Sequence, residues 1–259
     1  MSSIPESNLP KSGKYLYAIA ALGKDRTYEV AGMDGSAVYS ISKNGVAAVV
    51  SDCARSKIRP ERANLAIHKE VLKRLMLDST ILPMAFGIIA DDLKAVRRML
   101  SLNQHAFVEQ LGRVAGKVEM GLRVAWDVPN IFEYFIEIHP ELRAARDRLL
   151  GNQRDPHQED KIELGQLFDR LLNEDREAHY EKLEEVLAPC CAEIKRSPPR
   201  NVNEAVNLNC LVERSIQKQM EDAVFKAAGL FDNNYAFDLN GPWAPHNFVE
   251  MDLKLNNSK

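Results

Sequence analysis

The stretch that decides the fold is His68–Asp92, HKEVLKRLMLDSTILPMAFGIIADD. Its first part continues an upstream pattern in which apolar residues recur every three or four positions, the spacing that places side chains on one face of a helix. Asp78 and Ser79 are expected to end that helix. The stripe consists of Leu65, His68, Leu72, Leu75 and Met76.

The middle part of the stretch, Ile81–Ile89, is almost wholly apolar and too short for a second helix. It therefore predicts a strand that is covered on both faces. Pro83 lacks an N–H group and is expected at the start of the strand or at the edge of the sheet. Asp91 is placed to cap the helix that follows. The stretch is thus expected to join the elements of a domain rather than to form a reaction centre.

Three motifs give the chain a resemblance to a known family. One is His-x-x-Val-Leu followed by Ile-Leu-Pro-x-x-Phe-Gly, within residues 68–87. The second is the β-prone run Tyr15–Ile19, and the third is LNGPWAPHNFV at residues 239–249. Together they resemble the gas vesicle protein F/L family (GvpF/GvpL), over nearly the whole chain after the first dozen residues. Ala244 and His246 depart from the family's usual proline and tyrosine.

Composition is typical of a soluble globular protein. The chain has 259 residues, of which 45% are hydrophobic and 27% charged, enough for one large or two ordinary domains. No segment approaches the roughly 20 uninterrupted apolar residues of a membrane span. Residues 1–14 are polar, without a hydrophobic signal core, and are expected to be flexible. A cytoplasmic location follows as an expectation.

Charge is divided unevenly along the chain. Residues 1–114 carry 16 basic and 11 acidic side chains, whereas residues 115–259 carry 18 basic and 26 acidic ones. This asymmetry supports a boundary near Val114–Gly116, and two domains at 15–114 and 115–259.

The first domain is expected to contain a strand, a hairpin, a helix, a strand and further helices. Asn44-Gly45 between two β-prone runs is the strongest short-range hairpin signal in the chain. Gly23–Gly35 is expected to be a loop. The expected elements are a strand at Tyr15–Ala20, hairpin strands at Val38–Ser42 and Val46–Ser51, and helical spacing from Leu93 to Val114 with a weak break at Ser101–Asn103.

The second domain is expected to follow the order strand, helices, strand, helix, strand. Together with the family resemblance, this order implies an α+β chain whose C-terminal domain is a modified ferredoxin-like sandwich with an acidic helical insertion and a proline-rich tail. The expected elements are a strand at Lys117–Trp126, a helical region at Pro129–Leu150 split by Pro140, a surface turn at Gly151–Pro156, a helix at Gln158–Ile194, a strand at Val206–Val212, a helix at Glu213–Gly229 and a strand at Asn234–Leu239.

Motifs that carry chemistry are absent from the sequence. The six histidines form no HxH or HExxH pattern, and the four cysteines show no CxxC spacing, so neither a metal site nor a cofactor is predicted. No glycine-rich phosphate loop precedes a helix. Cys190 and Cys191 are adjacent, which on a helix points their side chains about 100° apart, and all four cysteines are interpreted as buried, reduced thiols. His68 is interpreted as a packed core histidine.

Two classes of function remain. The resemblance implies a non-enzymatic gas vesicle accessory protein, a minor structural component or an assembly factor, whose partners are the gas vesicle shell protein and other accessory proteins. The alternative is a nucleic-acid-binding ferredoxin-like module, but its strands at 118–126 and 206–212 offer only Trp126 as a stacking aromatic. We therefore expect no nucleic acid, lipid membrane or small-molecule substrate, and we rank an enzyme last.

A local excess of positive charge suggests where a partner binds. Residues 55–74 carry seven basic and two acidic side chains beside the apolar stripe. The acidic helix with Glu181, Glu184 and Glu185 could instead neutralise this face. The tail is expected to pack on the chain, with an exposed hook as the alternative. The candidate partner-binding residues are Arg59, Arg62, Lys69, Lys73, Arg74, Trp243 and Phe248.

Overall fold

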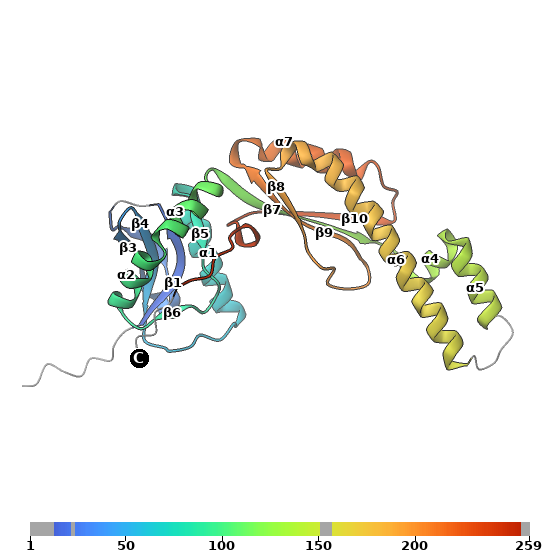
Figure 1. The fold of residues 1–259 in the computed structure, drawn as a ribbon, viewed down its shortest axis with the longest axis horizontal. Coiled ribbons are helices and arrows are strands. Elements are labelled where there is room, and N and C mark those ends of the chain that lie inside the picture. Colours follow the sequence, from blue (N-terminus) through green and yellow to red (C-terminus); the bar gives the residue numbers. More distant parts are fainter. Residues whose placement is uncertain (1–12, 22–23, 151–156, 255–259) are drawn as a thin grey trace, which may run out of the picture. The chain divides into compact units, whose positions relative to one another are not determined.

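The computed structural model describes residues 13–21, 24–150 and 157–254. Their contacts divide them into two compact units (Figure 1). The first unit contains the described residues up to Glu119 together with those from Pro242 onward, and the second contains Met120–Gly241. The sequence placed the boundary five residues earlier, and it assigned the tail to the second domain, whereas the contacts group the tail with the first unit.

The first unit is built on one sheet of long and short strands. Its strands follow the order β2-β3-β4-β1-β5, and β6 also pairs with β1. All pairings given for this sheet are antiparallel. The strands are β1 (Gly13–Ala20), β2 (Thr27–Ala31), β3 (Ala37–Lys43), β4 (Val46–Cys53), β5 (Ile81–Pro83) and β6 (Ile89–Ala90).

Helices cover both faces of this sheet. Tyr15 and Tyr17 of β1 contact His68 of α1 (Arg62–Asp78), while the intervening Leu16 lies beside α2 (Leu93–Leu102). Neighbouring residues of a strand point to opposite faces, so the two helices lie on opposite sides. This coverage explains why β1 reads as a continuous apolar run. A third helix, α3 (Gln104–Arg113), follows α2 after a break at Asn103.

The predicted strand Ile81–Ile89 is wrong as a single element. Only Ile81–Pro83 and Ile89–Ala90 are strands, and both pair with β1. The residues between them turn, with Gly87 at φ +89°, a conformation that glycine adopts without strain. Pro83 does lie at the edge of the sheet, on β5, as predicted.

Other local expectations are met or corrected by small shifts. The hairpin between β3 and β4 turns at Asn44 and Gly45, whose φ values of 54° and 85° suit a tight hairpin turn. Asp92, not Asp91, caps α2, because its Oδ1 accepts a hydrogen bond from the Ala95 N–H at 2.7 Å. The expected loop at Gly23–Gly35 contains β2 and a short 3-10 turn at Met33–Gly35.

The second unit carries a four-stranded sheet in the order β10-β7-β9-β8. Helices α6 and α7 lie along one of its faces (Figure 1). The burial of β7 alternates, as the period-two pattern predicted, so the other face of the strand is half-exposed. The elements are β7 (Lys117–Trp126), α4 (Ile131–Ile138), α5 (Pro140–Leu150), α6 (Gln158–Leu187), β8 (Glu193–Arg196), β9 (Glu204–Glu213), α7 (Gln217–Ala228) and β10 (Tyr235–Trp243).

The long acidic helix is shorter than predicted. It ends at Leu187, and a 3-10 turn at Ala188–Cys190 leads into β8, whose first two residues were predicted to be helical. Pro189 in that turn explains the early end, since proline lacks the N–H that the helix needs. The split at Pro140 is confirmed, and the predicted turn at Gly151–Pro156 lies outside the described residues.

No helix within the described part of the chain is long and apolar enough to span a membrane.

Candidate functional site

The sequence motifs of the first unit meet in an aromatic cluster around His68. The ring centroid of His68 lies 5.7 Å from those of Tyr15, Tyr17 and Phe86. The Tyr15 hydroxyl and His68 Nδ1 are 2.9 Å apart, and the same hydroxyl accepts a hydrogen bond from the Gly87 N–H at 3.1 Å. The Tyr15 hydroxyl therefore forms hydrogen bonds with both His68 and Gly87, which lie far from it in the sequence.

The electrostatics of this cluster indicate a structural role. Burial lowers the pKa of His68 to about 4, and the nearby His246 adds to this effect. Burial likewise raises the pKa of Tyr15 to about 12. Both side chains are therefore neutral near pH 7, and the interpretation of His68 as a packed core histidine is confirmed by its 5% exposure.

The C-terminal motif packs on the first unit. Phe248 is fully buried, and Glu119 receives two hydrogen bonds from Asn247, at 2.9 Å from its backbone N–H and at 2.6 Å from its side-chain amide. Packing of the tail is thus confirmed for these residues. Phe248 is thus covered in this state, whereas Trp243 is 44% exposed, and the selection of both as partner-binding residues stays a prediction.

The outer side of α1 carries the predicted positive charge. Arg62, Lys69 and Lys73 lie seven and four residues apart on the helix and are exposed, and Arg59 is exposed just before it. We call these four residues the basic face. Among the described residues, no ion pair to an acidic side chain is found for any of them. Leu77, one turn beyond Lys73, is 70% exposed and extends the same stripe.

Two predicted participants in charge pairing behave differently. Arg74 is half-buried and lies 3.4 Å from Asp78, so its charge is already matched within α1. In the second unit, Glu184 pairs with Arg196 at 2.6 Å, and this contact raises the pKa of the Arg196 guanidinium. We therefore define the basic face without Arg74, whose selection as a partner-binding residue stays a prediction, and Glu184 has a partner on its own unit.

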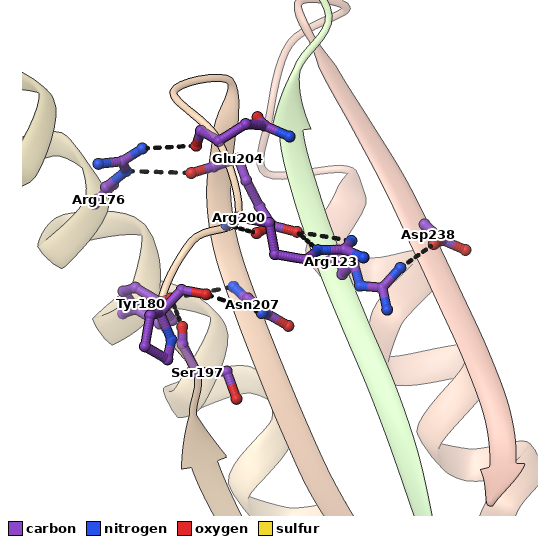
Figure 2. A network of polar contacts seen from close by, with 10 residues as sticks. Arg123, Arg176, Tyr180, Ser197, Arg200, Glu204, Asn207 and Asp238 are labelled. Atoms are coloured by element: carbon purple, nitrogen blue, oxygen red, sulfur yellow. Dashed lines mark hydrogen bonds and ion pairs between the residues drawn. The ribbon is translucent and has the colours of Figure 1, made fainter. Parts of the chain in front are cut away.

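In the second unit, polar contacts brace the loop between β8 and β9 (Figure 2). The Arg176 guanidinium of α6 donates to the backbone carbonyls of Asn201, Val202 and Glu204 at 3.3, 3.0 and 3.2 Å. The Tyr180 hydroxyl donates to the Ser197 carbonyl at 3.1 Å. One helix thus holds the loop at both of its ends.

A concavity of about 470 Å³ lies between this braced loop and the half-exposed face of the sheet. Its charged side chains are paired: Arg200 donates to Glu204 at 3.0 Å, and Arg123 lies 3.5 Å from Asp238 (Figure 2). Such matched charges leave no excess for a charged ligand. Within the described residues, no group of three His, Cys, Asp or Glu side chains could hold a metal ion.

Sequence analysis missed this braced loop. Proline and glycine patterns show that a loop exists, but they do not show that an arginine from a distant helix will bind its carbonyls. Pro198 and Pro199 indicate that helical structure stops before this segment, but they do not indicate the bracing.

Comparison with known proteins identifies the family. The profile of the gas vesicle synthesis protein GvpL/GvpF family matches residues 13–250. The chain belongs to this family. Gas vesicle protein F of Dolichospermum flosaquae is 26% identical over 244 residues, covering 92% of this chain and 98% of that protein. Gas vesicle protein L1 of Halobacterium salinarum is 23% identical, covering 94% and 92%.

Solved structures of GvpF share the fold. The crystal structure of GvpF from Anabaena sp. PCC7120 superposes with a TM-score of 0.80 at 25% identity, covering 93% of this chain and 99% of that one. The structure from Microcystis aeruginosa gives 0.78 at 21% identity and covers 93% and 100%. The mixed α/β fold, and a gas vesicle accessory role for the chain, follow from the GvpL/GvpF family.

Proposed function

We propose that this chain is a non-enzymatic accessory protein of gas vesicle formation that binds the small hydrophobic shell protein, as a minor vesicle component or as an assembly factor. Its place of action would be the cytoplasm, at the gas vesicle. Membership of the GvpL/GvpF family supports the accessory role. Other gas vesicle accessory proteins are a second class of partner for the same surface.

The observation that carries the binding proposal is the unpaired charge of the basic face. Arg62, Lys69 and Lys73 share one exposed edge of α1, while His68 and Leu72 anchor the opposite edge in the core. The helix is therefore held rigidly by one side and presents cations on the other. Such a surface suits an acidic patch on a vesicle protein, with exposed Leu77 adding an apolar contact.

We further propose that the second unit is a ferredoxin-like sandwich with a helical insertion. The order β7, helices, β8, β9, α7, β10 supports this assignment. Counted within the unit, its strands lie in the sheet in the order fourth, first, third, second. The insertion would be α4 and α5 with the outer part of α6.

Capture of the purified shell protein by the immobilised chain tests the binding proposal. We expect the triple variant Arg62→Glu, Lys69→Glu, Lys73→Glu to lose about tenfold in capture at low salt, because charge attraction mainly speeds association. Raising the ionic strength should also reduce capture by the wild type, since exposed charges are screened beyond about 8 Å at physiological salt. The matched control reverses Lys94, Arg97 and Arg98, three exposed cations of α2 in the same unit.

Equal capture by the two triple variants would contradict the role of the basic face. Loss of capture in both, with unchanged melting temperatures, would show that only the net charge of the chain matters.

A further inference from the structure

A sulfur cluster lies where α6, the β8–β9 pair and α7 meet in the second unit. Cys191 follows the 3-10 turn that ends α6, Cys210 lies within β9, and Met220 lies in α7. The Cys191 thiol is 3.8 Å from the Met220 sulfur. It also forms a hydrogen bond with the Cys210 thiol, and this contact lowers the pKa of Cys191. Three sequence-distant elements thus bring two thiols into contact.

Backbone hydrogen bonds bring together the two chain segments that carry the cysteines. The Ala192 N–H donates to the Leu211 carbonyl at 2.8 Å, directly beside both thiols in the chain. From there β8 pairs with β9, and Ile194 lies opposite Cys210. The segment that carries Cys191 is therefore tied to β9 next to Cys210, and the side chains make the contact between the thiols.

The two cysteines differ in access. Cys191 is half-exposed, whereas Cys210 is fully buried. Of these two thiols, only Cys191 can therefore react with a reagent from solution, and Cys210 is shielded from it. Cys190 is also half-exposed, but its thiol points to the Gln219 carbonyl at 3.8 Å. This corrects the expectation that all four thiols are buried.

From this geometry we propose that Cys191 and Cys210 are a redox-responsive pair that a peroxide converts into an intramolecular disulfide. The Cys191 thiolate attacks one oxygen of hydrogen peroxide, the O–O bond breaks, and the hydroxide that leaves takes a proton to become water. The Cys191 sulfenic acid is then attacked by the Cys210 sulfur, which loses its proton as a second water leaves. Two thiols are oxidised by two electrons, and one peroxide is reduced to two waters.

The disulfide would close a ring from residue 191 to residue 210. This ring contains the edge strand β8 and the braced loop of residues 197–203. Closing it would remove freedom from the unfolded chain and would tie the end of α6 to the sheet. The inference stands on the second unit alone and does not depend on the basic face.

Peptide mapping of the full chain after treatment with hydrogen peroxide tests the proposal. Trypsin should release LEEVLAPCCAEIK, residues 183–195, and NVNEAVNLNCLVER, residues 201–214. We expect these two peptides to be joined with the loss of two hydrogens, and the bond to be cleaved by a reductant. Cys53 is buried on the other unit and serves as an internal control that stays alkylatable.

Cysteine variants show which sulfur atom reacts with the peroxide. In Cys191→Ser the linked fraction should fall about tenfold, because the remaining Cys190 thiol is directed elsewhere. In Cys190→Ser it should match the wild type. Cys210→Ala, which fits a buried site, should leave Cys191 as sulfenic or sulfinic acid without a link. A link that persists in Cys191→Ser, or a wild type that accumulates oxidised Cys191 without any link, would overturn the proposal.

Discussion

His68 shows how far a single residue could be interpreted from the sequence. Its place on an apolar helical stripe predicted a packed histidine, and the structure confirms it. The partners could not be predicted, because Tyr15 and Phe86 come from other elements whose approach depends on the whole sheet. Periodicity reports which side of a helix is buried, but it does not report what lies against that side.

The depressed pKa of His68 predicts acid sensitivity. The unfolded chain binds this proton near pH 6.5, whereas the native state resists it until about pH 4. The stabilisation is therefore complete above the unfolded value and is lost as pH falls, by about 2–3 kcal/mol between about pH 7 and pH 4.

Urea unfolding of the wild type and of His68→Gln across this pH range checks the prediction. The variant should lose less stability on acidification. His105, which is 98% exposed, provides the control His105→Gln, whose profile should follow the wild type. Parallel profiles for all three proteins would contradict the prediction.

The substitution Phe86→Ala should cost less unfolding free energy than the predicted strand implied. A covered strand would give a loss of about 3–5 kcal/mol for Phe86→Ala. Phe86 instead lies half-buried in the turn before β6, where its ring contacts Tyr15 and His68. We expect a loss of about 1–3 kcal/mol, since part of the cavity opens to solvent.

Leu82→Ala is the matched comparison, because Leu82 is 1% exposed on β5 of the same stretch. Its loss of unfolding free energy should be the larger of the two, about 2–5 kcal/mol. The reverse order in chemical denaturation would place Phe86 in the core.

At the scale of elements, local signals decided which predictions held. The Asn44-Gly45 hairpin was predictable because both residues tolerate the positive φ that the turn requires. The run at Ile81–Ile89 was not, since hydrophobicity alone does not distinguish one strand from two short strands joined by a turn. Strand β8 was missed because Ile194, within it, continues the helical spacing of α6.

The cap of α2 gives a sharp test of local structure. Asp92→Ala removes the oxygen that accepts the Ala95 N–H and should cost about 0.5–2 kcal/mol. Its neighbour Asp91 is exposed and does not cap the helix, so Asp91→Ala should change stability by less than about 0.5 kcal/mol. Thermal unfolding of the two variants compares them, and equal losses would show that the carboxylates act only through charge at the helix start.

At the scale of the whole molecule, the sequence predicts two domains and a basic binding surface, which stay predictions, and the contacts form two compact units. The path of the C-terminal tail could not be predicted from the sequence. Charge asymmetry located the passage from one unit to the other within a few residues, but nothing in the composition showed that the tail returns to the first unit. The hydrogen bonds that hold it join Glu119 to Asn247 and Asn103 to Lys254, over separations that local patterns do not cover.

Truncation tests the importance of this return. A chain ending at Trp243 loses buried Phe248 and leaves the Glu119 carboxylate without its two donors on Asn247. The lost hydrogen bonds to a buried carboxylate and the lost aromatic should together cost about 3–5 kcal/mol in the first unit. Amide hydrogen exchange should show faster exchange in β1 and α1, with α6 unchanged.

The control is a chain that ends at Lys254, which keeps the hydrogen bonds to Asn103 at 2.8 and 3.3 Å. It should exchange like the full chain. Unchanged protection of β1 in the Trp243 truncation would mean that the tail adds nothing to the core.

The return of the tail also sets an order for biosynthesis. A ribosome adds about 5–20 residues per second, so the stretch between Glu119 and Pro242 takes roughly 6–24 seconds to emerge. During that interval the nascent first unit exposes the site that Phe248 later fills. The second unit, whose residues are contiguous, can finish folding first although its codons are translated later. Residues synthesised after the second unit therefore complete the unit that was begun first, and a nascent chain halted before Pro242 offers chaperones an uncovered core.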